Sequence, residues 1–350
     1  MAPILCEMEQ NSLPFRLILT GQHEETIDQL LMEFGIETTP EKLHQGKEIS
    51  GVMQMGGWFI HCLWLCLTQS KTLFSASTQI DNVILVHGDT ISTLLGAIIG
   101  KILGFRVAHI EAGLRSKNLF HPFPEELTRL AVFRLSSISF CPGQWACNNL
   151  SRYRTERIDT RHNTLIDALA IALQESSMEP VHSSGNYGVV SIHRFENIFS
   201  ISRLTKIVEL IEKAAESYPL IFVLHPSTRK KIVEYNLLER IEKNPQIKVV
   251  ARMGYIHFVG LMKNASFVIS DGGGNQEELS YLGVPTLLMR KATERQEGLN
   301  HTATLCCYEE SQLILFLSRL SSARHSFKRP SLSPTKIIVN RLADFASAPQ

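Results

Sequence analysis

The stretch VILVHGDTISTLLGAIIGKILGFRVAHIE, residues 83–111, decides the fold class of this chain. Its two ends, 83–88 and 106–110, are short and continuously apolar, which is typical of strands buried on both faces of a sheet. Between them, apolar residues recur three and four positions apart, at Ile91, Leu94, Leu95, Ile98, Ile99 and Ile102. A strand, a helix and a second strand in this order predict a right-handed crossover between two parallel strands.

The same alternation runs through the rest of the chain. Further strands are expected at 15–20 and 138–142 in the first half, and at 189–193, 221–225, 249–253, 267–271 and 285–289 in the second. We predict an α/β protein with two Rossmann-like, doubly wound domains that face each other across a cleft. The domains are expected at 1–173 and 189–331, joined by a polar linker at 174–188, with a final helix in 332–350 that crosses back to the first domain.

Composition excludes several function classes. A net charge of +1 provides no broad basic field, so no nucleic-acid partner is expected. The longest apolar stretch, 58–67, is too short to span a bilayer, so it predicts a buried helix and no membrane partner. The 7 cysteines form no C-x-x-C pair, which argues against a zinc ribbon or a redox motif. An odd number of cysteines without a signal peptide suits a reducing cytoplasm.

Polar residues crowd the carboxyl ends of the predicted strands, where open parallel sheets bind their ligands. In the first half these residues are Gln22, His23, His87, Asp89, His109, Glu111 and Arg115. In the second half they are His193, Arg194, His225 and Asp271. Each alone has an ordinary explanation, such as a hydrogen-bonded structural histidine or an aspartate that caps a helix. So many at the same edge of two sheets favour a functional site.

The segment DGGGNQEE, residues 271–278, is the strongest single signal. Three glycines, Gly272, Gly273 and Gly274, follow a predicted strand and open a helix, whose free N–H groups and dipole attract anions. The segment therefore predicts a cradle for a phosphate or diphosphate, with Glu278 placed to accept hydrogen bonds from ribose hydroxyls. The alternative is a tight turn that needs positive φ. The Walker lysine and the G-x-G-x-x-G spacing are both absent, so neither ATP hydrolysis nor NAD binding is indicated.

The loop HPFPEE, residues 121–126, is stiffened by two prolines just before a helix expected from Leu127. Together with Asp89 and Glu111, Glu125 would bring three carboxylates from three elements to one place. Crowded carboxylates acquire different pKa values, which suits acid/base chemistry. The simpler explanation is that acidic residues are favoured in the first turn of any helix.

Ten motifs, in the same order along the chain, resemble the non-hydrolysing UDP-N-acetylglucosamine 2-epimerase family over roughly residues 1–310. They are TGQH (20–23), VHGDT (86–90), HIEAGLRS (109–116), FPEE (123–126), NTLIDAL (163–169), HRFEN (193–197), HP (225–226), DGGGNQEE (271–278), LGVP (282–285) and TERQE (293–297). The resemblance implies a glycosyltransferase-B-like fold with a UDP-binding C-terminal domain. It implies interconversion of UDP-N-acetylglucosamine and UDP-N-acetylmannosamine by elimination and re-addition of UDP, without cofactor or obligatory metal. It also implies a cytoplasmic homodimer whose small-molecule partner is a UDP-sugar.

The resemblance assigns roles to single residues. It implies that Asp89, Glu111, Glu125 and His193 carry out proton transfer and charge stabilisation. It implies that UDP is bound by Gln22, His23, Gly273, Gly274, Glu278 and Arg295. We expect Arg115, His225 and Gly272 to bind the substrate as well. These roles agree with the chemistry, because the weakly acidic proton at sugar C2 needs a carboxylate base in a site that excludes water.

The start of the chain departs from the family pattern. The family normally begins with a strand that ends in a G-T-R-P-E loop, whereas this chain starts at Met1-Ala2-Pro3 and continues with apolar residues at helical spacing. We therefore expect the first strand to be missing, and with it an arginine contact to the diphosphate. Smaller departures are Gly272 in place of serine, His162 in place of glycine and Gln296 in place of proline.

Four other functions fit parts of the pattern. A glycosyltransferase of the same fold would share the glycine loop but would not need the three carboxylates. A hydrolysing epimerase would release UDP and free N-acetylmannosamine, and a truncated, inactive binder would follow from the missing strand. The weakest alternative is a metal site formed by His87, Asp89, His109 and Glu111.

Overall fold

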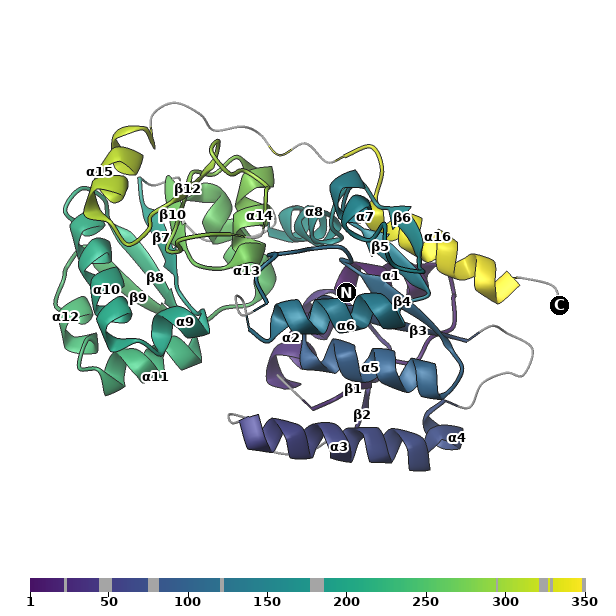
Figure 1. Ribbon diagram of the computed structural model, residues 1–350. Coiled ribbons are helices and arrows are strands. Elements are labelled where there is room, and N and C mark those ends of the chain that lie inside the picture. Colours follow the sequence, from purple (N-terminus) through teal and green to yellow (C-terminus); the bar gives the residue numbers. More distant parts are fainter. Residues whose placement is uncertain are drawn as a thin grey trace. The chain divides into compact units, whose positions relative to one another are not determined.

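The computed structural model describes most of the chain (Figure 1). The described residues are 1–21, 24–43, 52–74, 82–119, 123–176, 186–293, 295–320, 327 and 330–347. Contacts between residues divide the chain into two compact units. Unit 1 comprises Met1–Ala168 and Pro330–Gln350, and unit 2 comprises Leu169–Arg329. Each unit is an α/β structure with its own parallel sheet.

The main sheet of unit 1 contains four parallel strands in the order β3-β4-β5-β6. These strands are β3 Val83–His87, β4 Arg106–Ile110, β5 Ile138–Cys141 and β6 Glu156–Asp159. A separate parallel pair joins β1 Ile18–Leu19 to β2 Glu41–Lys42. The helices are α1 Ala2–Gln10, α2 Glu24–Glu33, α3 Val52–Thr68, α4 Ser70–Leu73, α5 Ile91–Ile102, α6 Glu125–Leu135, α7 Gln144–Asn149, α16 Pro334–Ser347 and the start of α8 Leu165–Ser176.

Helices cover both faces of the four-stranded sheet, which is why its strands are apolar throughout. On one face, Ile110 of β4 packs in a cluster with Ile4 of α1 and Phe345 of α16. Val107 of the same strand, three positions away, packs in another cluster with Val132 of α6. The C-terminal helix α16 thus belongs to the core of unit 1.

Helix α5 positions the loop that follows β3. Thr90 begins the helix as its N-cap, because its Oγ1 accepts the N–H of Thr93 at 3.3 Å. Gly100 lets the helix lie close to the sheet, since a Cβ at this position would lie 2.7 Å from Cγ2 of Val107. Both ends of the 87–90 loop are therefore anchored, one in β3 and the other in α5.

Unit 2 contains a six-stranded parallel sheet in the order β12-β11-β10-β7-β8-β9. The strands are β7 Gly188–Ser191, β8 Leu220–Leu224, β9 Ile247–Ala251, β10 Phe267–Ser270, β11 Thr286–Leu288 and β12 Ala303–Leu305. The helices are the end of α8, α9 Phe195–Ile198, α10 Ile201–Ala215, α11 Pro226–Glu234, α12 Leu238–Glu242, α13 Tyr255–Asn264, α14 Gly273–Leu282 and α15 Glu310–Ser318.

The strand order of unit 2 reverses between β7 and β10. The chain runs outward from β7 through β8 to β9, then returns to pair β10 on the other side of β7. Ligands of doubly wound sheets bind beyond the carboxyl ends of the strands at such a reversal. The residues that follow β7 and β10, His193 and Asp271 among them, are therefore at the expected place for a ligand.

The predicted α/β class with parallel sheets is confirmed. Each predicted strand is present, although the first is reduced from 15–20 to Ile18–Leu19. Three strands were not predicted: β2, β6 and β12. Strand β6 has the sequence ERID and its first two residues are exposed, so it lacks the apolar run by which the other strands were found. Helix α6 begins at Glu125 instead of Leu127.

The prediction that 58–67 forms a buried helix is right for the helix and wrong for its burial. Trp58 and Cys62 of α3 are buried, whereas Ile60 and Trp64 on the other side expose 69% and 59% of their surface. The whole stretch is apolar, so the sequence carries no contrast that would distinguish the two faces. Within the described segments, no helix is long and apolar enough to cross a membrane.

Candidate active site

Glu111, the residue directly after β4, has a strained backbone conformation. Its φ is 62°, in the left-handed region that residues other than glycine seldom adopt. Gly113 also has a positive φ, and a Cβ there would lie 2.3 Å from the backbone oxygen of Ala146. Such strain persists where the surrounding structure imposes it, and it concentrates at functional sites. The carboxylate Oε2 of Glu111 lies 3.4 Å from Nε2 of His87.

The two histidines at this edge are neutral at pH 7. Burial lowers the pKa of His109 to about 4, and its Nε2 lies 2.8 Å from the backbone oxygen of Gly88, to which the neutral ring donates. The ring also packs 5.8 Å from that of Phe133, so the ordinary structural explanation holds for His109. Burial lowers the pKa of His87 as well, although Glu111 acts to raise it. The described residues contain no group of three or more histidine, cysteine or acidic side chains that could hold a metal ion.

A buried ionic network connects Asp89 with Arg115. Arg129 on α6 places its Nη2 2.5 Å from Oδ2 of Asp89, and its Nη1 lies 3.4 Å from Oε2 of Glu126. Glu126 also accepts hydrogen bonds from Nε of Arg115 at 2.5 Å and from the backbone N–H of Ser116 at 3.0 Å. Burial alone would raise the pKa of Glu126, but Ser116 and the two arginines lower it below its ordinary value.

Glu125, the first residue of α6, lies one helical turn before Arg129 and so on the same side of the helix. Its Oε2 is buried, and in the part of the chain that the structure describes this atom has no hydrogen-bond partner. Asp89 and Glu111 both act to raise the pKa of His87. Asp89 and Glu111 therefore lie beside His87 at the carboxyl edge of β3 and β4, and Glu125 lies on the side of α6 that carries Arg129, the ion-pair partner of Asp89. That the three carboxylates act together stays a prediction.

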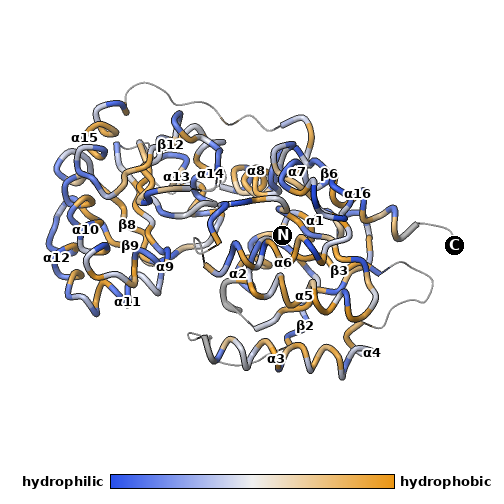
Figure 2. The backbone as a smooth tube through the Cα atoms, viewed as in Figure 1, coloured by the Kyte–Doolittle hydropathy of each residue, from blue (hydrophilic) through white to orange (hydrophobic). Residues whose placement is uncertain are grey.

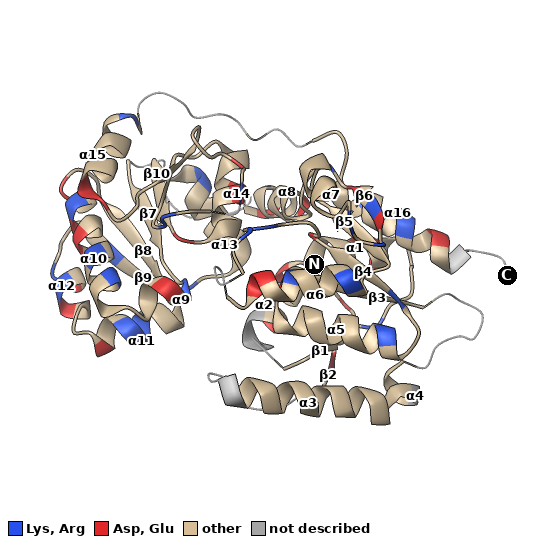
Figure 3. Ribbon diagram, viewed as in Figure 1, with Lys and Arg blue, Asp and Glu red and all other residues tan. Residues whose placement is uncertain are grey.

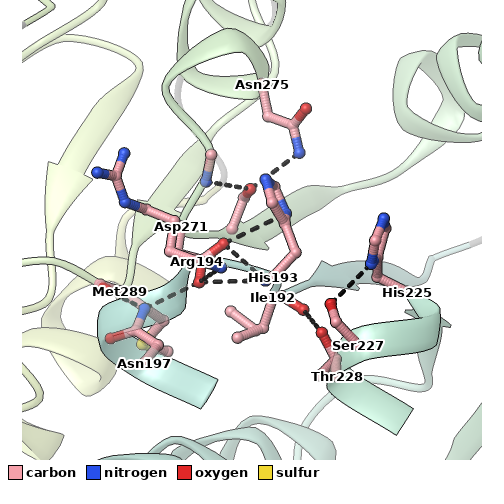
Figure 4. Close-up of polar contacts among 12 residues, drawn as sticks. Ile192, His193, Arg194, Asn197, His225, Ser227, Thr228, Asp271, Asn275 and Met289 are labelled. Atoms are coloured by element: carbon pink, nitrogen blue, oxygen red, sulfur yellow. Dashed lines mark hydrogen bonds and ion pairs between the residues drawn. The ribbon is translucent and has the colours of Figure 1, made fainter. Parts of the chain in front are cut away.

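In unit 2, Asp271 holds the residues that follow β7 (Figure 4). Asp271 is fully buried and accepts hydrogen bonds from the backbone N–H groups of His193 and Arg194, each at 3.0 Å, and from Nδ2 of Asn197 at 2.9 Å. Oδ1 of Asn197 in turn accepts the hydroxyl of Tyr308 at 2.7 Å. Asp271 thus fixes the backbone of His193, whereas 40% of the His193 side chain is exposed.

The imidazole of His193 has a second histidine beside it. The ring of His225 lies 6.1 Å from that of His193, and its Nδ1 lies 2.8 Å from Oγ of Ser227. His225 precedes Pro226, the first residue of α11, so its position is fixed by a helix start. Both predicted histidines of unit 2 therefore lie together beyond adjacent strands.

The glycine loop begins α14 without a side-chain cap. Gly272 is the N-cap, with a φ of −78° in the extended region, so the alternative of a turn that needs positive φ is wrong at this position. The helix starts at Gly273, and the N–H groups of its first turn have no partner within the helix. This arrangement is the one that binds anions at helix N-termini.

Farther along α14, three consecutive polar residues are buried. Glu278 exposes 5% of its surface, and burial raises its pKa to about 7, although Tyr255 and Arg295 act to lower it. Glu277 forms an ion pair with Arg295, and Gln276 donates from Nε2 to the backbone oxygen of Arg295 at 3.2 Å. The predicted UDP-binding Arg295 is therefore tied to α14 by two residues that the sequence analysis did not select.

The structure divides the predicted site residues between its two units. Asp89, Glu111, Arg115 and Glu125 lie in unit 1, and His193, His225, Gly272, Gly273, Gly274, Glu278 and Arg295 lie in unit 2. Gln22 and His23 lie outside the described residues. The expectation that both sets act on one ligand stays a prediction.

Known proteins resemble this chain over most of its length. A family model described as UDP-N-acetylglucosamine 2-epimerase matches residues 7–334. The chain belongs to this family. The UDP-N-acetylglucosamine 2-epimerase of Methanocaldococcus jannaschii is 32% identical over 345 residues, which cover 94% of this chain and 91% of that protein. The crystal structure of the M. jannaschii UDP-GlcNAc 2-epimerase in complex with UDP-GlcNAc and UDP matches with a TM-score of 0.85 at 29% identity, covering 98% of this chain and 95% of that one.

Another relative carries a different name. The UDP-2,3-diacetamido-2,3-dideoxy-D-glucuronate 2-epimerase of Pseudomonas aeruginosa is 35% identical over 244 residues, which cover 68% of this chain and 67% of that protein. These comparisons confirm the predicted epimerase family and the glycosyltransferase-B-like fold.

Position 272 is one of the expected departures from the family pattern, with glycine in place of serine. A Cβ on Gly272 would lie 2.9 Å from Cε1 of His193 and 3.4 Å from Cγ of Asn275. The imidazole of His193 therefore occupies space that a side chain at 272 would need. A serine at this position requires His193 to take another orientation, so the departure and the placement of His193 belong together.

Proposed function

We propose that this chain is a non-hydrolysing epimerase that interconverts UDP-N-acetylglucosamine and UDP-N-acetylmannosamine. The observation that carries the proposal is that Asp89 and Glu111 lie beside His87 at one sheet edge, with Glu111 in a strained backbone. Glu125 supports it, because it lies on the side of α6 that carries Arg129, the partner of Asp89, and one of its oxygens is buried without a partner among the described residues. A glycosyltransferase needs no such set. The name of the M. jannaschii relative, and the UDP-GlcNAc and UDP in its structure, point the same way.

The cluster suits the chemistry of inversion at C2. Epimerisation takes a proton from one face of C2 and returns one to the other face, so the proposal assigns the two transfers to different groups of the carboxylate set. Removal of the C2 proton forms a double bond between C1 and C2 as the bond between C1 and the UDP oxygen breaks. Re-addition of UDP to C1 and delivery of a proton to C2 remove the double bond and restore the UDP-sugar. A carboxylate base in a site shielded from water is strong enough to begin this sequence.

The proposal assigns UDP to unit 2. The diphosphate would accept N–H groups from the start of α14, and negative charge that develops on the departing UDP would be stabilised by His193 and that helix N-terminus. Glu278 would bind the ribose. The side chain of Arg295 is held by Glu277, so its contribution to the diphosphate would be positional as well as electrostatic.

Gly273→Val is expected to weaken UDP binding by at least about tenfold, because a branched side chain at the helix start blocks the approach of phosphate to the backbone. Isothermal titration calorimetry with UDP alone measures the effect. Ala303→Val, in an edge strand of the same sheet, serves as the control for a general loss of fold. Undiminished affinity for UDP in Gly273→Val would show that the phosphate site lies elsewhere.

Glu278 gives the protein a pH-dependent stability. Its folded pKa of about 7 lies above the ordinary value of 4.5, so its contribution to folding is fully present below pH 4.5 and is lost as the pH rises through 7. This difference corresponds to up to about 3 kcal/mol of unfolding free energy. Denaturant titrations from pH 4.5 to 8 should show Glu278→Gln gaining stability over the wild type by this amount. A pH-independent difference between the two would contradict the burial of the charge.

We further propose a homodimer in a reducing, cytoplasmic compartment. The support for the dimer is the family resemblance together with α3, which carries no Lys, Arg, Asp or Glu (Figures 2 and 3). This helix exposes the side chains of Ile60, Trp64 and Leu67. The support for the compartment is that all seven cysteines are free. Sedimentation equilibrium should give twice the chain mass of 39.4 kDa, and a monomer at micromolar concentration would rule the dimer out.

Proton and phosphorus NMR of the protein with UDP-GlcNAc tests the activity. A second UDP-linked sugar indicates the proposed epimerase, and free N-acetylmannosamine with UDP indicates the hydrolysing type. Turnover that requires an added acceptor indicates a glycosyltransferase, and binding without turnover indicates an inactive binder. Because the P. aeruginosa relative is named for a diacetamido uronate, UDP-2,3-diacetamido-2,3-dideoxy-D-glucuronate is the second substrate to offer.

A further inference from the structure

We propose that Glu126 is a positioning residue of this active site, which fixes Asp89 through Arg129 and at the same time holds Arg115. This role rests on the proposed function of Asp89. Neither Glu126 nor Arg129 is among the residues that the motifs single out as catalytic. The two arise from one helical turn of α6, three positions apart.

Glu126 is placed as the centre of the network. It has no solvent-exposed surface, and it accepts three donors: Nε of Arg115, the N–H of Ser116 and Nη1 of Arg129. Arg115 and Ser116 belong to the segment that follows Glu111, and Arg129 belongs to α6. One carboxylate therefore joins the segment after β4 to the helix that carries Glu125.

Arg129 carries the effect onward to Asp89. Arg129 exposes only 4% of its surface, so its positive charge must be compensated by nearby carboxylates. Among the described residues its ion-pair partners are Glu126 and Asp89, and Nη2 lies 2.5 Å from Oδ2 of Asp89. If Glu126 loses its charge, Arg129 keeps one partner instead of two and is drawn toward Asp89, which shifts both side chains.

A helix-capping role does not account for this arrangement. Acidic residues in a first turn stabilise the helix dipole from an exposed position. Glu125 occupies the first turn as well, so capping requires no second, fully buried carboxylate. Burying a charge is costly unless it is paired, and all three donors to Glu126 come from segments that carry predicted site residues.

The test compares Glu126→Gln with Asp167→Asn. Asp167 is a matched control, because it is a buried carboxylate of unit 1 that accepts Oγ of Ser333 at 2.8 Å and the N–H of Thr335 at 3.0 Å, and no proposed role in the reaction falls to it. Glu126→Gln should lower kcat about 10–100-fold with KM changed less than about twofold, because misplacement of a reacting group affects turnover more than binding. Asp167→Asn should lower the melting temperature and leave kcat unchanged.

A double-mutant cycle separates positioning from general destabilisation. If Glu126 acts through Asp89, Glu126→Gln should change the rate less than about threefold in an Asp89→Asn background. A full effect in that background, or a wild-type kcat in the single variant, would overturn the proposal. If Glu126→Gln does not fold, Glu126→Asp and Arg129→Lys replace it in the same cycle, since both keep the charges.

A crystal structure of Glu126→Gln keeps this test independent of the proposed function. We expect the Arg129–Asp89 contact to shift or break and the Arg115 side chain to move. If the wild type shows no epimerisation, the proposed function fails, while the positioning role is still decided by that structure. Asp89, Arg115 and Arg129 unmoved in the variant would contradict it whatever the reaction.

Discussion

Glu111→Gln is expected to lower kcat by about 10²–10⁴-fold while UDP binding stays unchanged, because it removes a proton-transfer group and keeps its shape. Glu111 has a strained φ of 62°, and glutamine can occupy the same backbone. The effect should therefore fall on turnover and not on folding. Initial rates with UDP-GlcNAc, together with calorimetry for UDP, measure both quantities.

Glu156→Gln is the control for this prediction. Glu156 is a carboxylate of the same sheet, paired with Arg341 on the surface of unit 1, and its loss should leave the rate at the wild-type level. If Glu111→Gln turns over UDP-GlcNAc as fast as Glu156→Gln, Glu111 takes no part in proton transfer.

Asp271→Ala is expected to destabilise unit 2 by about 3–5 kcal/mol, because it leaves buried donors without their charged acceptor. The donors are the N–H groups of His193 and Arg194 and Nδ2 of Asn197. Nδ2 of Asn197 would keep only its bond to the backbone oxygen of Met289, and the segment after β7 would lose its anchor. We also expect kcat to fall, because the position of the His193 imidazole depends on this segment.

Amide hydrogen exchange locates the loss, because it reports local opening segment by segment. Protection should fall in β7, α9 and β10, whereas the strands of unit 1 should keep theirs. Asn275→Ala is the matched control, because it removes a single hydrogen bond from the first turn of α14 to Ser270 and should cost about 1 kcal/mol. Equal protection in Asp271→Ala and Asn275→Ala would show that Asp271 does not hold this segment.

The strands and the position of the polar residues could be predicted from the sequence because both follow from local pattern. A run such as 83–88 is apolar at every position, and a parallel sheet brings the residues after each run to one edge. Strand β6 could not be predicted in this way, because its sequence ERID is polar and two of its side chains face solvent at the edge of the sheet. The exposed face of α3 could not be predicted either, because the sequence of that helix is apolar on all sides.

The roles of neighbouring polar residues depend on contacts between distant segments, which local pattern does not contain. His109 and Glu111 are two positions apart at the end of one strand, yet one is a buried structural histidine bonded to Gly88 and the other a strained carboxylate. Glu125 and Glu126 are adjacent and chemically identical. Only the packing of α6 against the segment after β4 directs Glu126 to Arg115 and leaves an oxygen of Glu125 buried without a described partner.

Hydrogen exchange at C2 of the sugar tests the central claim most directly. The protein is incubated with UDP-GlcNAc in D₂O, and the C2 proton is followed by NMR. If one carboxylate of unit 1 removes this proton and a different, solvent-exchanged group delivers a deuteron to the opposite face, the UDP-linked epimer must carry deuterium at C2, and at equilibrium the remaining UDP-GlcNAc must carry it too. An epimer that retains its original C2 proton, or no loss of the C2 signal at full protein stability, would contradict the account.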